Sequence, residues 1–295
     1  MRFLKHVVPV VALGLAVLCV PACNKAPEQA KFATPEEAAA ALLQALKADS
    51  PEKLQAIFGR DAMEAAASGD PVSDRHDREV LVLAMEQSWR WAPRGENSRE
   101  LIVGDEQWPF PAPLIKSGNQ WQFDANAGKE EVLARRIGRN ELGVIGLCRD
   151  YVDMQKEYAS QPHDGKPAGL FAQRLRSTPG HQDGLYWPVK PGERPSPLGD
   201  LAAEAAAEGY DQNKPASAPF WGYHFKIITA QGPAASGGFA LLAYPAKYAS
   251  SGVMTFVVSQ DGVVYEKDLG KETATEAPRL MEYKPDDSWT AVRVP

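Results

Sequence analysis

The chain has 295 residues, a formal charge of −6, 24 Gly, 24 Pro and 3 Cys. These counts exclude a fibrous repeat, which needs far more glycine, and a disulfide scaffold, which needs far more cysteine. A nucleic-acid partner is not expected for an acidic chain, because such binding depends on neutralising phosphates. The hydrophobic content of 44% is ordinary for a folded globule.

An export signal is predicted at the N-terminus. Arg2 and Lys5 precede the apolar run Val7–Val20, whose 14 residues would span about 21 Å as a helix. A bilayer core is roughly 30 Å thick, so this short run after a basic start is typical of a signal peptide rather than of a membrane span. Residues 1–22 are therefore excluded from the fold prediction.

A lipid attachment site follows the apolar run. The stretch Val20-Pro21-Ala22-Cys23 resembles the lipobox of bacterial lipoproteins, in which the cysteine receives the lipid. We expect Cys23 to be acylated and residues 23–31 to form a tether, since more than one acyl chain gives stable anchoring. The alternative is plain secretion with Cys23 as a free thiol. Asn24, in place of an Asp, favours the outer membrane, on the periplasmic side of the cell envelope.

The mature domain has to be held together by packing alone. Without residues 1–22 the chain has 273 residues and a formal charge of −8. Cys148 is then the one cysteine besides Cys23, which excludes an internal disulfide. A domain of this size buries enough surface to be stable without one.

The N-terminal part predicts three helices. Thr34–Leu46 begins with Thr34 as N-cap and Glu37 completing a capping box, and Ser50–Gly59 repeats the start signal. A third helix is expected over Arg75–Trp91. Its predicted stripe is Val80, Leu83, Ala84 and Gln87.

Short strands are expected after these helices. The ranges Arg99–Val103, Leu114–Lys116 and Trp121–Phe123 have strand composition, and Ser117-Gly118-Asn119 predicts a hairpin turn. Trp108–Pro111 is expected to be irregular or an edge, because proline cannot donate to a ladder. Residues 32–137 are thus predicted as a small α+β unit.

A second unit is predicted over residues 138–295. Gly128–Ile137 is helical by pattern, Gly138 is expected to interrupt the helix, and Asn140 to cap a further helix that ends near Ser160. The residues sharing one face of that helix are Val144, Leu147, Cys148 and Tyr151.

A proline-rich insert, residues 161–222, follows the long helix. Its nine prolines exclude long regular elements apart from Leu201–Glu208. A loop this long is uncommon in a compact domain unless it covers something. We expect it to pack down as a lid through Phe171, Tyr186, Trp187, Tyr210, Phe220 and Trp221.

The C-terminal part predicts an antiparallel meander. The strand ranges are Tyr223–Thr229, Gly238–Tyr244, Val253–Ser259 and Val263–Glu266. Short connections such as Gln260-Asp261-Gly262 favour antiparallel pairing, and the long helix is expected on one face. The fold class is therefore α+β: an N-terminal helical unit with a β-hairpin, then a long helix packed on a C-terminal meander with an insert.

Five stretches carry a resemblance to a known family. They are Phe32–Ala38, Trp108–Pro111, Arg135–Leu142, Gly184–Pro188 and Gly238–Gly270. With them the chain resembles an uncharacterised, exported bacterial family, the domain of unknown function 2950, which implies export but supplies no catalytic residues. Many relatives have an Asp-Gly-rich run after the long helix that looks like a cation-binding loop. Here Pro162–Pro167 keeps one Asp, and calcium needs six or more oxygens, so calcium is not expected.

The C-terminal half also resembles pseudopilin heads at the level of fold. The likeness rests on a helix beginning at Asn140, a variable region and a meander ending at Ser259–Val263. Those heads serve assembly rather than catalysis, so the resemblance implies an assembly role. The apolar membrane half of a pilin helix is absent before Asn140.

Three groups of residues have both a chemical and a structural interpretation. Asp74-Arg75-His76-Asp77 could contribute to a metal site, and also suits a helix start. His163-Asp164 and His181-Gln182-Asp183 could meet to bind zinc or for acid–base work. Cys148 could be a nucleophile, but on an apolar helix face it behaves as a small hydrophobe. We predict no catalytic residue, metal site or cofactor.

Two further groups could bind a ligand. A local basic patch could hold a phosphate headgroup or a cell-wall carboxylate, or its members could simply form ion pairs such as Glu131–Arg135. The patch consists of Arg135, Arg136, Arg139 and Arg149. Aromatic residues could stack on sugars or pin the insert to the core. These are Tyr186, Trp187, Trp221 and Tyr223.

The sequence therefore predicts a cell-envelope lipoprotein with a non-enzymatic binding or assembly role. The expected partners are the membrane, through the N-terminal lipid, and an envelope protein or the cell wall. The basis is negative: unpaired cysteines, five scattered histidines and no nucleophile–base motif. The alternative is a periplasmic hydrolase acting on a cell-wall or glycan substrate under the 161–222 lid.

Overall fold

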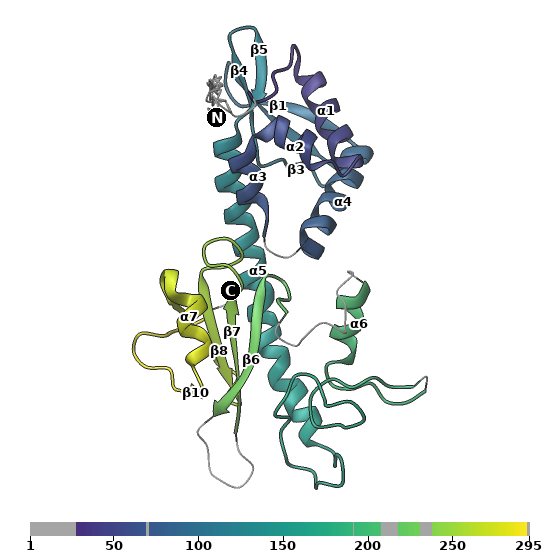
Figure 1. Cartoon of the computed structure of the whole chain (residues 1–295), viewed down its shortest axis with the longest axis vertical. Coiled ribbons are helices and arrows are strands. Elements are labelled where there is room, and N and C mark those ends of the chain that lie inside the picture. The colour runs from purple at the N-terminus through teal and green to yellow at the C-terminus, as the bar shows by residue number, and fades with distance from the viewer. Residues whose placement is uncertain (1–27, 69–70, 191, 208–217, 231–237, 294–295) are drawn as a thin grey trace, which may run out of the picture.

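The fold consists of two packed units joined by one long helix (Figure 1). The computed structural model describes residues 28–293 except 69–70, 191, 208–217 and 231–237. The joining helix α5, Ala125–Ala159, has 35 residues and is about 52 Å long. The fold class is α+β, as predicted.

The first two helices begin where their caps predict. In α1, Pro35–Lys47, the Thr34 hydroxyl accepts a hydrogen bond from the Glu37 amide at 3.1 Å. In α2, Pro51–Phe58, Ser50 caps in the same way. A further helix, α3 over Arg60–Ala66, was not predicted, and it has no side-chain cap to signal its start.

The third predicted helix is confirmed, but its predicted C-terminal end and its predicted buried face were wrong. Helix α4 spans Pro71–Gln87, and the residues after it form strand β1, Trp89–Pro93. Val80 and Leu83 are 50% and 60% exposed, whereas Met85 is buried. Six consecutive apolar residues, 80–85, surround the helix, so periodicity alone could not select the buried face.

The N-terminal sheet has the order β1-β2-β4-β5, with β3 paired to β2. Its predicted strands are confirmed as β2 Ser98–Val103, β4 Leu114–Ser117 and β5 Gln120–Phe123. Strand β3, Trp108–Pro109, pairs only with β2, as its prolines suggested. The core between the sheet and α1, α2 and α4 includes Leu42, Leu54, Met85, Leu101 and Phe123.

Helix α5 runs unbroken where the sequence predicted a break. Gly138 lies inside it, and the predicted cap Asn140 is a buried interior residue. The Asn140 side-chain amide donates to the carbonyl oxygen of Ser251 at 2.9 Å. Packing against both units therefore outweighs the cost of about 1 kcal/mol for an interior glycine. The predicted boundary between residues 137 and 138 falls within α5.

The predicted C-terminal meander is confirmed. Its strands are β6 Tyr223–Ala230, β7 Gly238–Pro245, β8 Met254–Ser259 and β9 Val264–Asp268, all paired antiparallel in sequence order. Two short strands extend its edges: β10 Glu282–Tyr283 beside β6 and β11 Thr290–Ala291 beside β9. One face packs on α5, through Tyr151, Leu241, Phe256 and Val258.

The other face of the meander has its own small core. Ile228, Leu242 and Val257 pack against Leu280 and Trp289 of the C-terminal segment. That segment contains η1 Gly270–Glu272, α7 Thr273–Glu276 and η2 Ala277–Arg279. The packing of this segment on the meander was not predicted, because its elements are only three or four residues long and too short to show a periodic pattern.

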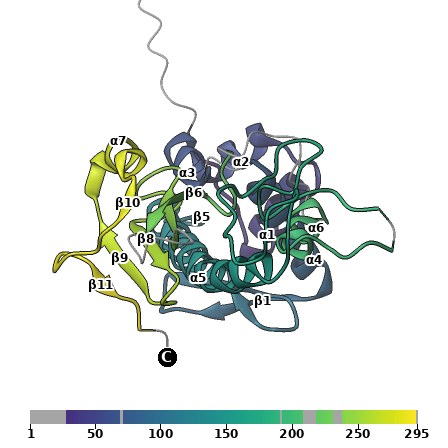
Figure 2. The ribbon, with the colours of Figure 1, turned by 90° about the horizontal axis from the view of Figure 1, so that it is seen from below.

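The insert lies against α5 on the side away from the meander (Figure 2). Within the described residues its helix is α6, Gly199–Ala207, close to the predicted range. Gln155 of α5 is fully buried, and its side-chain amide exchanges two 2.9 Å hydrogen bonds with the backbone of Ala172. The ring of Phe171 packs edge-on against Phe239, with centroids 4.7 Å apart. The insert is thus anchored on the core.

None of the helices in the described part of the chain is long and apolar enough to cross a membrane.

Candidate functional site

A groove of about 280 Å³ opens where the insert wraps the C-terminal end of α5. Its lining combines aromatic rings with groups of both charges. They include Tyr158, His163, Lys166, Phe171, Arg174 and Asp183. Two of them, His163 and Asp183, belong to the motifs singled out in the sequence.

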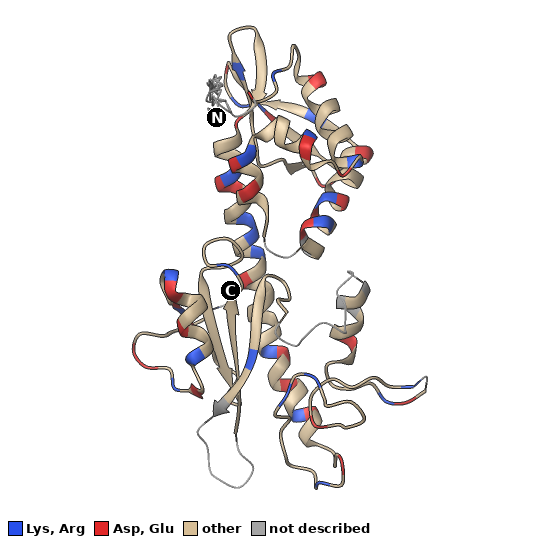
Figure 3. Ribbon diagram, in the orientation of Figure 1, with Lys and Arg blue, Asp and Glu red and all other residues tan. Residues whose placement is uncertain are grey.

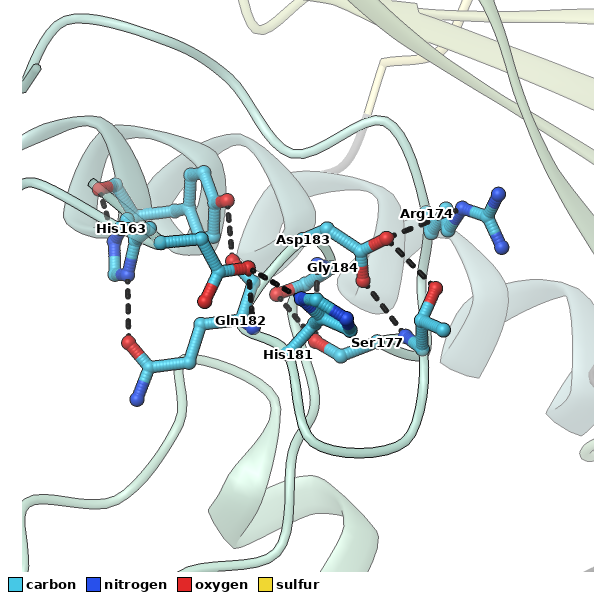
Figure 4. A network of polar contacts seen from close by, with 10 residues as sticks. His163, Arg174, Ser177, His181, Gln182, Asp183 and Gly184 are labelled. Atoms are coloured by element: carbon cyan, nitrogen blue, oxygen red, sulfur yellow. Dashed lines mark hydrogen bonds and ion pairs between the residues drawn. The ribbon is translucent and has the colours of Figure 1, made fainter. Parts of the chain in front are cut away.

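His163 is held by four contacts, of which Figure 4 draws the two polar ones. Its ring stacks on that of Tyr158, with centroids 4.0 Å apart, and Trp187 meets it edge-on. Its Nε2 lies 2.9 Å from the Tyr158 carbonyl oxygen and its Nδ1 3.2 Å from the Gln182 side chain. Because a carbonyl oxygen only accepts, Nε2 carries the proton, and in the neutral ring Nδ1 then accepts from Gln182 with the NH₂ of that side-chain amide turned toward it. Both ring nitrogens are therefore engaged within the protein.

The two histidine motifs are brought together, as the sequence allowed. The Asp164 carboxylate accepts a hydrogen bond from the backbone amide of Gln182 at 2.8 Å and lies 3.5 Å from Nδ1 of His181. The Tyr158 hydroxyl donates to the Gln182 carbonyl oxygen at 2.6 Å. These contacts clip residues 163–164 and 181–182 to the last turn of α5.

The Asp183 side chain closes a tight loop by hydrogen bonding to Thr178. Its carboxylate accepts from the Thr178 amide at 2.7 Å and from the Thr178 hydroxyl at 2.8 Å. These hydrogen bonds lower the pKa of Asp183. A Cβ at Gly184 would lie 2.7 Å from the Ser177 amide nitrogen, so the loop requires glycine there.

Within the described ranges no three His, Cys, Asp or Glu side chains lie where they could hold an ion. Cys148 is fully buried, and burial raises the pKa of its thiol to about 12, which keeps it protonated and unreactive at neutral pH. Asp74 accepts from the Ser68 amide, and Asp77 pairs with Arg139, so both have structural contacts.

Three arginines of the predicted basic patch are bound to the protein itself. Arg135 contacts Glu131 and lies over the Trp108 ring, and Arg136 donates to the carbonyl oxygens of Ala65 and Ala66. Arg139 forms a bidentate salt bridge with Asp77, while Arg149 lies exposed further along α5. Figure 3 shows basic and acidic residues interspersed along the upper half of α5.

The predicted aromatic residues do not form one platform. Trp187 packs against Tyr158, and Tyr186 lies under the Arg176 guanidinium. Trp221 stacks on Phe220 with ring centroids 4.4 Å apart and contacts α5 at Gly143. Positions 143 and 158 are about 22 Å apart along the helix. Trp221 and Trp187 therefore occupy different places on α5, and Tyr223 is fully buried in the core. Tyr210 lies outside the described residues.

Comparison with known families identifies the chain. The profile described as "Protein of unknown function (DUF2950)" matches residues 29–292.

The chain belongs to the DUF2950 family.

The matched range covers both units and the groove, and it confirms the family suggested by the sequence. Searches of curated proteins and of solved structures found no match. The likeness to pseudopilin heads is therefore not confirmed.

Several groove residues were not predicted from the sequence. Lys166 and Arg174 come from the insert, and Phe171 was assigned only to packing. Tyr158 follows Tyr151 and Gln155 at helical spacing, a signal that could have extended the buried face to the end of α5. Nothing in the local pattern places Lys166 beside Arg174.

The lowered pKa of Asp183 predicts an acid-sensitive insert. A carboxylate whose pKa is lowered on folding stabilises the fold above its unfolded value, near 3.9, and this contribution is lost as the pH falls through the folded value. We expect hydrogen-exchange protection of the Thr178 amide to hold from neutral pH to about 4 and then to fall.

Asp183→Asn should lower that protection already at neutral pH, because the amide oxygen replaces only one of the two carboxylate oxygens and carries no charge to strengthen the remaining bond from Thr178. The exposed residue Asp150 provides the control, and Asp150→Asn should behave like the unmodified protein. Full protection of Thr178 in Asp183→Asn would contradict the prediction.

Proposed function

We propose that this protein is a lipid-anchored component of the bacterial cell envelope with a non-enzymatic binding or assembly role. One observation carries the proposal: three of the side chains singled out as possible catalytic groups are committed to the fold. His163 uses both ring nitrogens, Asp183 is hydrogen-bonded through both oxygens and Cys148 is buried. An open groove remains beside His163 and Asp183, which suits binding.

The proposed anchor is Cys23, which lies outside the described residues. Acyl chains contribute about 0.8 kcal/mol per buried methylene, so their loss should release the protein. In a bacterial host, Cys23→Ser should abolish labelling by radioactive palmitate and shift the protein from the membrane fraction to the soluble fraction. Cys19→Ser, within the predicted signal, should keep both. Membrane retention of unlabelled Cys23→Ser would contradict lipid anchoring.

The binding or assembly role is tested by cross-linking in the native envelope. The lipidated protein would then be purified in detergent together with whatever is bound to it. A stoichiometric envelope protein or cell-wall fragment is the expected result. Recovery of the bare protein at good yield would overturn the proposed role.

A periplasmic hydrolase acting on cell-wall or glycan material is the second candidate. It is favoured by His181, whose Nδ1 lies 3.5 Å from Asp164, as an oriented general base would require. In the described part of the chain no hydroxyl or thiol is hydrogen-bonded to the His181 ring, so the pair lacks a nucleophile. Hydrolysis of envelope polymers by the purified protein, lost in His181→Ala, would establish this function instead.

A further inference from the structure

The apolar lining of the groove is fixed before any ligand arrives. The Tyr158 and His163 rings are stacked, and Phe171 is wedged against Phe239. Leu170 lies beside them in the lining. A preformed apolar surface binds a ligand without an ordering cost, which favours a compact apolar group there.

Among the residues that line the groove, cations outnumber carboxylates. The lining holds Lys166, Arg174 and one carboxylate, Asp183, which already accepts two hydrogen bonds from Thr178. The nearby Asp164 carboxylate is engaged by the Gln182 backbone amide and lies 3.5 Å from His181 Nδ1. Arg174 Nε lies 3.6 Å from Asp183, too far for a hydrogen bond, and its side chain is 62% exposed. Within the described residues no carboxylate pairs with the Lys166 ammonium.

This local charge is opposite to that of the protein as a whole. The chain carries a formal charge of −6, which repels anions from most of its surface. An anion would therefore be drawn to the groove. The flat guanidinium of Arg174 matches the two oxygens of a carboxylate, and Lys166 adds a second cation.

We infer that the groove binds the free carboxylate of a small peptide-like ligand with a short apolar side chain. Lys166 and Arg174 hold the carboxylate, Leu170 and Phe171 take the apolar side chain, and Asp183 accepts an N–H of the ligand through its remaining lone pairs. A volume of about 280 Å³ is at the lower end for ligand sites and limits the bound part to one or two residues. The inference rests on the proposed binding function and names its ligand class.

The test is calorimetric titration of the full-length protein, purified in detergent from the envelope. The probes are N-acetyl-L-leucine and N-acetyl-D-leucine, with N-acetyl-L-leucinamide, acetate and inorganic phosphate as comparisons. We expect saturable binding of an N-acetyl-leucine, none of the neutral amide, and weaker binding of acetate and phosphate. Preference for the D form would point to cell-wall peptides as the source, and preference for the L form to protein or peptide ends.

Two double variants separate the groove from general charge. Lys166→Gln/Arg174→Gln should weaken binding by at least about tenfold, with unchanged thermal unfolding because both side chains lie at the surface. Lys129→Gln/Arg94→Gln changes the charge equally at exposed positions of the N-terminal unit and should bind normally.

Phosphate binding as tight as that of N-acetyl-leucine would overturn the assigned ligand class. Equal weakening in both double variants, or no saturable probe, would overturn the groove as the site. The proposed function fails separately, through recovery of the bare protein after cross-linking or through hydrolysis of envelope polymers.

Discussion

Gly252→Ala should destabilise the C-terminal unit by about 3 kcal/mol, because the new methyl group would overlap a buried tyrosine. A Cβ at this position would lie 2.0 Å from the Tyr223 hydroxyl oxygen and 2.5 Å from the ring carbon that bears it. Tyr223 is fully buried and donates to the Met254 carbonyl oxygen at 3.0 Å. The ring has to move, which disturbs both core packing and this hydrogen bond.

The measurement is the free energy of unfolding from chemical denaturation. Tyr223→Phe removes the closest atom, so the double variant Tyr223→Phe/Gly252→Ala should be less destabilised than the sum of the single variants. Gly146→Ala is the matched control, since its Cβ would have nothing within 4 Å. Because alanine is favoured over glycine in a helix interior, Gly146→Ala should stabilise the protein by about 0.5–1 kcal/mol. A neutral Gly252→Ala would contradict the packing at Tyr223.

Arg136→Ala should destabilise the N-terminal unit by about 3 kcal/mol, at the upper end of the range for hydrogen bonds made by a charged group. Arg136 is 8% exposed and its guanidinium donates to the carbonyl oxygens of Ala65 and Ala66 at the end of α3. Burial lowers the pKa of Arg136, whereas Asp74 and Asp77 raise it. Removing the side chain leaves the last carbonyls of α3 without donors and both carboxylates without this cation.

Arg139→Ala is the control on the same helix. Arg139 contacts Asp77 at 2.8 Å through both Nη1 and Nη2, but the two side chains are 55% and 41% exposed. Such a surface pair is worth less than about 1 kcal/mol. The loss of stability in Arg136→Lys should be intermediate, because a lysine ammonium keeps the positive charge but lacks the planar guanidinium that donates to two acceptors at once. Equal losses for Arg136→Ala and Arg139→Ala would show that burial does not set the strength of these contacts.

The parts of the fold that could be predicted have strong local signals. The Thr34 and Ser50 hydroxyls cap helices by accepting hydrogen bonds from backbone amides three positions on, so the start of each helix can be predicted from the local sequence. The hairpin turn after Ser117 and the turn at Gly262 joined the strands as expected. Helix α3 and the short elements after Asp268 lacked such signals and were missed.

The candidate site could be predicted only in part. His163 and His181 were recognised as residues that could meet, because a long insert permits convergence. Their roles depend on the carbonyl of Tyr158 and on the side chains of Asp164 and Gln182, which no spacing rule reveals. Arg136 was grouped with its neighbours, although its burial sets it apart from them.

By itself, the sequence determined the α+β class, the order of the main helices and strands, and the family, since caps, turns and alternation act over a few residues. The tertiary structure alone decided that α5 continues through Gly138, which face of α4 is buried, and that the insert forms a groove. These outcomes depend on contacts between residues far apart in the chain. Asn140 meets Ser251 and Gln155 meets Ala172, and such contacts override the local preferences of a glycine or a polar side chain.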